Sequence, residues 1–255
     1  MTSMTSSPRL QPELEYDIFV LAYQNDRKEA KNLALVAKRV FDWLIRHIFR
    51  VVVFSNTRSI PIRFNKTIYR RHGHHVRHLY LQSPDMQEHL DMFPNVVNLV
   101  FWIDHDLTHP SSLIQLPLTL LSTGSFEVTR LLARKLIYLD LIATFGPHST
   151  DDWASLYLPQ LTHLCVLYAT PRSSVELFLD RKRCPELRMV ISWDHADSEF
   201  PVLGELNEDL AEMDDARVVA VKCYAQRDWE AGARGGMDMW RFAEGIIADR
   251  NGTRL

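Results

Sequence analysis

The stretch FPNVVNLVF (residues 93–101) decides the fold class, because it joins a proline-led turn to a short apolar burst. Within it, Val96, Leu99 and Phe101 follow the spacing apolar, two residues, apolar, one residue, apolar. A short apolar run that follows a turn signal is typical of a buried β-strand. The stretch therefore predicts a turn followed by a strand.

The same spacing recurs along the chain. The other copies are Val76-Leu79-Leu81, Leu136-Leu139-Leu141, Leu161-Leu164-Val166 and Val218-Val221-Cys223, with a weaker version from Leu187 through Val190 to Ser192. Successive copies begin 20, 40, 25, 26 and 31 residues apart, so the longest gap holds either a hidden repeat or a longer helix. Proline-led turns precede two further copies, and residues 126–133 and 175–181 have the apolar spacing of amphipathic helices.

A strand followed by a helix every ~20–29 residues is the leucine-rich-repeat unit, in which each repeat buries its apolar face against the next. The asparagine that usually follows the strand is missing in every copy. We therefore expect an α/β protein in which residues 51–226 form an irregular leucine-rich-repeat-like solenoid with uneven turns. Residues 227–255 are expected to form a terminal helix that covers the open end of the last repeat, as solenoids require.

The first fifty residues have a different pattern of apolar and polar residues. Residues 1–9 are rich in Ser and Thr and are expected to be disordered. Apolar residues then recur at helical spacing from Pro12, through Leu14, Ile18 and Leu21. After a polar loop at 24–29, a second helix is predicted over residues 30–48, and the β-branched run 51–54 predicts a strand.

Residues 10–50 resemble an F-box, and more narrowly the F-box-like proteins abundant in mushroom-type fungi. The resemblance rests on Leu10-Gln11-Pro12-Glu13-Leu14, on the pair Ile18-Phe19, and on the run 33–40 with Trp43. Gln11 stands where the family has its first proline. Shorter pieces at 75–81, 214–221 and 228–236 are similar to the same family.

The resemblance implies that the helical module docks on the Skp-type adaptor of a cullin–RING ubiquitin ligase, while the solenoid holds an unknown protein substrate. The expected adaptor face comprises Leu10, Pro12, Leu14, Ile18, Phe19, Leu33, Val36, Val40 and Trp43. Two short helices cannot bury all of these side chains against each other, so they pack either on the solenoid or on a partner. The alternative is a stand-alone interaction scaffold whose F-box-like helices only cap the solenoid.

Composition points to an ordinary globular interior. Apolar residues make up 46% of the 255 residues, and the net charge of −3 gives no global bias toward nucleic acid or membrane. The first residues lack the apolar region of a secretory signal, and three widely separated cysteines suggest reduced thiols, so a cytoplasmic or nuclear location is expected.

Three groups of polar residues are candidates for chemical sites. The histidines at 72, 74, 75 and 78 could ligate a metal, but Arg70, Arg71 and Arg77 flank them and would repel a cation. Residues 104–109 and the pair Asp194-His195 could perform acid–base chemistry, although no nucleophile or glycine-rich phosphate loop accompanies them. We therefore expect no catalytic site, no metal and no cofactor.

Charge is distributed unevenly along the chain. Residues 57–84 contain six Lys or Arg and no acid, whereas residues 189–216 contain nine acids and no Lys or Arg. In a solenoid the order in sequence is the order in space, so one end is expected to be basic and the other acidic. Either this is ordinary solvated surface, or Arg70, Arg71 and Arg77 help to steer a protein partner of reversed polarity.

Overall fold

The computed structural model describes residues 10–54, 65–82, 90–101, 110–142, 150–196 and 200–252. Within these residues a nine-stranded sheet has the order β1-β2-β3-β4-β5-β6-β7-β9-β8, and only the β8–β9 pair is antiparallel. The strands are β1 Val51–Phe54, β2 His78–Leu81, β3 Asn98–Phe101, β4 Leu120–Thr123, β5 Tyr138–Leu141, β6 His163–Leu167, β7 Met189–His195, β8 Val202–Leu203 and β9 Val218–Cys223. The predicted α/β class is confirmed.

Each copy of the apolar spacing contains one of these strands. The 40-residue gap hides a further strand, β4, where Leu118 and Leu121 keep the spacing but Thr123 takes its third position. The antiparallel strand β8 was not predicted, because Val202 and Leu203 are both exposed and carry no pattern of burial.

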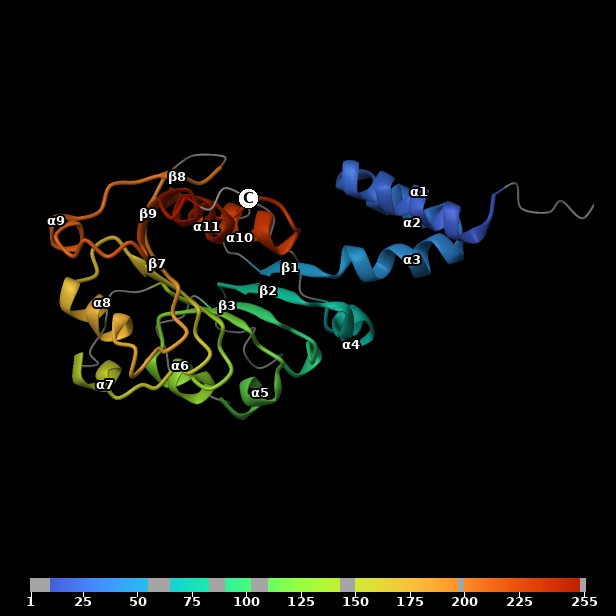
Figure 1. Cartoon of the computed structure of the whole chain (residues 1–255). Helices are drawn as coiled ribbons and strands as arrows, with labels where there is room; N and C mark the ends of the chain where they lie inside the picture. Colours follow the sequence, from blue (N-terminus) through green and yellow to red (C-terminus); the bar gives the residue numbers. More distant parts are fainter. Residues whose placement is uncertain are drawn as a thin grey trace, which may run out of the picture.

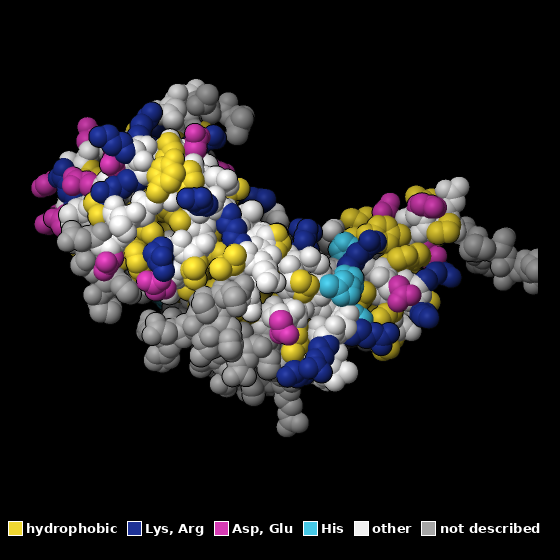
Figure 2. Space-filling model, turned by 90° about the horizontal axis from the view of Figure 1, so that it is seen from below, with side chains coloured by type: hydrophobic (Ala, Val, Ile, Leu, Met, Phe, Trp, Pro, Cys, Tyr) yellow, Lys and Arg dark blue, Asp and Glu magenta, His cyan; other side chains and the backbone are white. Residues whose placement is uncertain are grey.

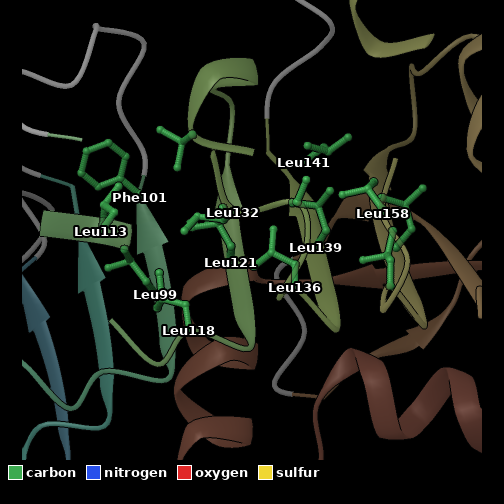
Figure 3. Packing of buried hydrophobic residues seen from close by; sticks show 14 of the residues in the cluster. Leu99, Phe101, Leu113, Leu118, Leu121, Leu132, Leu136, Leu139, Leu141 and Leu158 are labelled. Atoms are coloured by element: carbon green, nitrogen blue, oxygen red, sulfur yellow. The ribbon is translucent and has the colours of Figure 1, made fainter. Parts of the chain in front are cut away.

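One face of the sheet carries a continuous apolar row. Leucines at one register position lie side by side on neighbouring parallel strands and are fully buried: Leu79, Leu99, Leu121, Leu139 and Leu164. Figure 3 shows part of this row with leucines from the connecting segments packed against it. Burying a leucine side chain stabilises the folded state by roughly 2 kcal/mol, so each member of this row contributes substantially to the stability of the sheet.

Short helices cover that face (Figure 1). They are α4 Lys66–His72, α5 Pro110–Gln115, α6 Phe126–Leu132, α7 Thr150–Ala154 and α8 Arg172–Leu179, with the 3-10 turn η2 Gly73–His75 after α4. Polar side chains set where some of them begin. The Asn65 side chain accepts a hydrogen bond from the Ile68 amide at the start of α4, and Ser125 accepts one from Val128 at the start of α6.

The chain opens with three α-helices, α1 Pro12–Asn25, α2 Ala30–Leu35 and α3 Lys38–Ile48, and the 3-10 turn η1 Arg27–Glu29. The prediction of one helix over 30–48 is wrong, because the backbone is extended at Ala37 (φ −161°, ψ 154°). The break lets α2 fold back on α3, so that Ala30 joins Val40 and Leu44 in one buried cluster. In a single straight helix these side chains could not meet.

The C-terminal segment also departs from prediction. It forms two helices, α10 Ala225–Ala233 and α11 Met239–Arg250, instead of one. Gly235 between them has φ +84°, a left-handed conformation that ends α10, and the Asp238 side chain accepts a hydrogen bond from the Arg241 amide to start α11.

The position of α10 and α11 corrects the capping prediction. They lie across the second face of the sheet, opposite α4–α8, and not over the end of the last strand (Figure 1). This second face is called the strand face below. It carries apolar and aromatic side chains on several strands, including Val100, Ile191 and Val219, so covering it buries more apolar surface than covering one edge would.

Several predictions fall outside the described residues. These are the disordered tail 1–9, the bases Arg58 and Arg63, the acids Asp197 and Glu199, and the candidate acid–base residues at 104–109. None of the described helices has the length and apolar character needed to cross a membrane.

Candidate interaction surfaces

The N-terminal helices have a small core of their own. Tyr23, Val40 and Leu44 are buried together, and the Tyr23 hydroxyl donates a hydrogen bond of 3.0 Å to the carbonyl oxygen of His47. Val40 was assigned to the adaptor face, but it is fully buried in this core. It is removed from that face, because its side chain is already covered by helices of its own chain.

Helix α1 presents an apolar stripe to solvent. Leu14, Ile18 and Leu21, which are spaced four and three residues apart, are 52%, 52% and 57% exposed. Leu10, just before the helix, extends the stripe, which is called the α1 stripe below. The stripe is on the outside because Phe19 and Tyr23 occupy the opposite, inward side of the helix.

The junction between α2 and α3 adds two exposed apolar side chains. Leu35 is 83% exposed and Val36 is 63% exposed, because the extended backbone at Ala37 directs this turn away from the core. Figure 2 shows hydrophobic side chains gathered on the N-terminal helices. Contiguous exposed apolar surface of this kind is uncommon on a monomer and usually marks a binding site.

The structure therefore divides the predicted adaptor residues. It exposes Leu10, Pro12, Leu14, Ile18 and Val36, and it leaves Phe19, Leu33 and Trp43 half-buried against the core. Trp43 makes an edge contact with Tyr16, with ring centroids 5.8 Å apart. Leu21 and Leu35 were not predicted as site residues, although the apolar spacing of α1 already included Leu21.

The strand face, which is the side that solenoids usually offer as a binding surface, is occupied by α10 and α11. The Trp229 indole donates a 2.9 Å hydrogen bond from Nε1 to Asn98 Oδ1 and lies 5.3 Å from the Tyr80 ring. Trp240 contacts Tyr138 and His163, with ring centroids 5.4 and 5.9 Å away. Two tryptophans thus anchor the segment at separate strands.

A small cavity beneath these helices contains two buried acids. Asp140 comes from β5 and Asp228 from α10, and each has one side-chain oxygen without a hydrogen-bond partner among the described residues. Burial raises the pKa of each carboxyl group to about 7. The cavity volume is about 30 Å³, enough for one or two water molecules but not for an organic substrate.

The sequence did not predict the two cavity acids. A lone aspartate in a strand pattern, such as Asp140, looks like a solvated residue, and so does an aspartate in the first turn of a helix, such as Asp228. Asp140 lies beside Ser122 and Cys165 in the sheet register, and both hold its pKa lower than burial alone would. Asp228 Oδ2 accepts a hydrogen bond from the Met239 amide at 3.1 Å, so it also ties α10 to α11.

The charged stretches lie at opposite ends of the sheet. Arg70 and Arg71 are exposed on α4, and the Arg77 guanidinium donates to the Asn95 carbonyl oxygen at 3.2 Å just before β2. The acidic helix α9 (Glu208–Ala211) lies between β8 and β9 in the chain, at the far end of the sheet from α4 (Figure 1). The predicted spatial separation of the two charges is confirmed for the described residues.

The histidine cluster forms a turn. The His72 ring stacks with His75 at 6.3 Å, and Figure 2 shows histidines where the N-terminal helices meet the sheet. Among the described side chains, no group of three or more His, Cys, Asp or Glu is arranged to hold a metal ion. Cys165, Cys184 and Cys223 are free and buried, as predicted for reduced thiols.

A scan against models of protein families found no match to this chain, and searches of curated proteins and of solved structures found none either.

Proposed function

We propose that this chain is the substrate-recognition subunit of a Skp–cullin–F-box ubiquitin ligase. In this proposal α1, α2 and α3 form an F-box-like module that docks the Skp-type adaptor. The sheet and its helices form an irregular leucine-rich-repeat-like solenoid that binds a protein substrate. The subunit has no active site of its own and acts by bringing substrate and ubiquitin carrier together.

The observation that carries the proposal is the exposed apolar surface of the N-terminal helices. The α1 stripe and the α2–α3 junction remain uncovered although the chain has a large sheet against which they could have packed. A partner that buries Leu14, Ile18 and Leu35 would remove this apolar surface from water, which is the main driving force for association. The strands that follow one another in sheet order support the solenoid assignment.

Co-purification with a Skp-type adaptor tests the proposal. Replacing Leu14 and Ile18 together by alanine should abolish adaptor capture while changing the free energy of unfolding by under about 1 kcal/mol, because both side chains are half exposed. The matched control is Leu203→Ala, an equally exposed apolar side chain at the far end of the sheet, which should leave capture intact. Capture that survives the double change in a folded protein would show that the assigned face is wrong.

The alternative function is a stand-alone interaction scaffold in which the N-terminal helices only cap the solenoid. Contacts of α3 and the residue after it with α4, the first helix that covers the sheet, favour it: the Phe49 ring lies 5.8 Å from Tyr69, and the Phe41 ring lies 6.3 Å from His72. Under this alternative no adaptor is captured, and removal of the N-terminal helices lowers the melting temperature of the rest.

A further inference from the structure

A basic pocket lies where the N-terminal helices meet the C-terminal end of α10. It is called the junction pocket here, and it is a cavity of about 190 Å³ lined by side chains that include Arg27, His47, Arg50 and Arg234. Arg27 comes from η1, His47 and Arg50 from the end of α3 and the residues after it, and Arg234 from the end of α10. Segments nearly 200 residues apart in sequence thus contribute to one site.

The pocket has more positive charge than its neighbours neutralise. The Arg234 guanidinium is paired with Glu230 at 2.7 Å. Neither Arg27 nor Arg50 makes a side-chain hydrogen bond or an ion pair with any described residue. Two guanidinium groups in the pocket therefore have all their donors available.

The positive charges of the pocket lower the pKa values of the basic groups around it. The pKa of Arg27 is lowered by burial and then by Arg234, while Tyr23 and Glu230 oppose this lowering. The pKa of His47 is lowered by burial and then by Arg46 and Arg50. Nearby, the pKa of His78 falls to about 4 through burial, with Arg50, Arg77 and Arg234 adding to the effect. Like charges held together in this way are stabilised by a bound anion.

We propose that the junction pocket binds a phosphate monoester. The planar guanidinium forks of Arg27 and Arg50 match the oxygens of a phosphate, and arginine pairs with this group through two parallel hydrogen bonds. The volume accommodates the phosphate with a small attached group and is below the ~300–1,000 Å³ typical of pockets for larger ligands. The proposal does not depend on the adaptor function.

A bound phosphate would also join two parts of the chain. Arg27 and Arg50 belong to the N-terminal helices, whereas Arg234 belongs to α10, which covers the strand face. A ligand that binds only the folded protein stabilises it by RT ln(1 + [L]/Kd), so the melting temperature rises with the logarithm of the ligand concentration once that exceeds Kd. The phosphate ester is therefore expected to stabilise the contact between the N-terminal helices and α10.

The experiment titrates the full chain with phenyl phosphate and inorganic phosphate, with sodium chloride at equal ionic strength as the reference. Calorimetry gives the affinity, and thermal melting gives the stabilisation. Arg27→Gln and Arg50→Gln should each weaken phosphate binding roughly tenfold or more, because each removes a charge-assisted contact. Arg181→Gln, an exposed arginine on the far side of the sheet, should leave affinity unchanged.

A further substitution should strengthen phosphate binding where the arginine substitutions weaken it. Glu230→Gln removes the carboxylate that competes for Arg234, so phosphate should bind several-fold more tightly. The proposal is overturned if phosphate stabilises no more than chloride, or if Arg27→Gln and Arg50→Gln bind as the parent does. The affinity of a short phosphoserine peptide is measured in parallel. If the peptide binds more tightly than phenyl phosphate, the natural ligand is a phosphorylated protein. If it binds more weakly, the natural ligand is a small phosphate ester.

Discussion

Replacing Asp228 by asparagine is expected to remove much of a pH dependence that the buried acids impose on folding. Burial raises the pKa of Asp228 from 3.8 to about 7, with smaller increases from Asp238 and Asp140, while the Met239 amide opposes them. The pKa of Asp140 is raised to about 7 by burial, against hydrogen bonds from Ser122 and Cys165. Asparagine keeps the shape and the acceptor for Met239 but cannot ionise.

The sign follows from the protons bound in each state. Between pH ~4 and ~7 the folded protein retains protons that the unfolded chain has released, so stability is greatest at low pH and falls as the pH rises through this window. Above pH ~7 the loss from these groups is complete. A shift of roughly three units corresponds to about 4 kcal/mol for each aspartate, a large part of the ~5–15 kcal/mol typical of a folded domain.

Urea unfolding from pH 4.5 to 8 measures the effect in the parent, in Asp228→Asn, in Asp140→Asn and in the control Asp42→Asn, which changes an exposed carboxylate. Buried histidines such as His163, whose pKa is lowered, add a slope of the opposite sign, but they are present in every variant and cancel in the differences. Asp228→Asn should gain stability over the parent steadily up to pH 7. Parallel curves for the two proteins would refute the reasoning.

Three further outcomes are expected. Leu44→Ala, in the core of the N-terminal helices, should cost about 2–5 kcal/mol by urea unfolding, and a cost below 1 kcal/mol would contradict its burial. Truncation after Gln226 removes Trp240 and its neighbours from the strand face, so the shortened chain should bind a hydrophobic dye and melt lower; parent-like melting without dye binding would contradict this. Reversing three exposed bases should slow association with a partner more than it weakens folding, because screening already shortens the field to ~8 Å at physiological ionic strength. An association rate that does not change from low to high salt would contradict steering. These bases are Arg70, Arg71 and Arg77.

The sequence predicted the strands well, because their signal is local. Residues two apart in a strand share a face, so Leu99 and Phe101 are buried on the same side while Val100 points to the other. Strand β4 was hidden because Thr123 is polar, yet it is fully buried at a position where the two neighbouring strands have Phe101 and Leu141. A search for apolar spacing cannot detect a strand in which a polar residue occupies one of the buried positions.

The candidate interaction face was only partly predictable. The helical spacing of α1 identified Leu14 and Ile18, but the same reasoning placed Val40 on that face. Whether an apolar side chain of a helix faces the core or solvent depends on where its neighbours pack. Here the break at Ala37 decided it, and no proline or glycine marks that break.

By itself the sequence indicated the succession of the parallel strands, their buried side and the separation of basic and acidic ends, because consecutive parallel strands are neighbours in the sheet. Strand β8 is the exception, since it lies at the edge beyond β9. Only the tertiary structure decided where the C-terminal helices lie. The Trp229–Asn98 hydrogen bond joins residues 131 positions apart, and Arg27 meets Arg234 across a still longer separation. Such contacts form because folding brings two apolar surfaces together and excludes water from between them. The spacing of residues along the chain does not indicate which two surfaces will pack against each other.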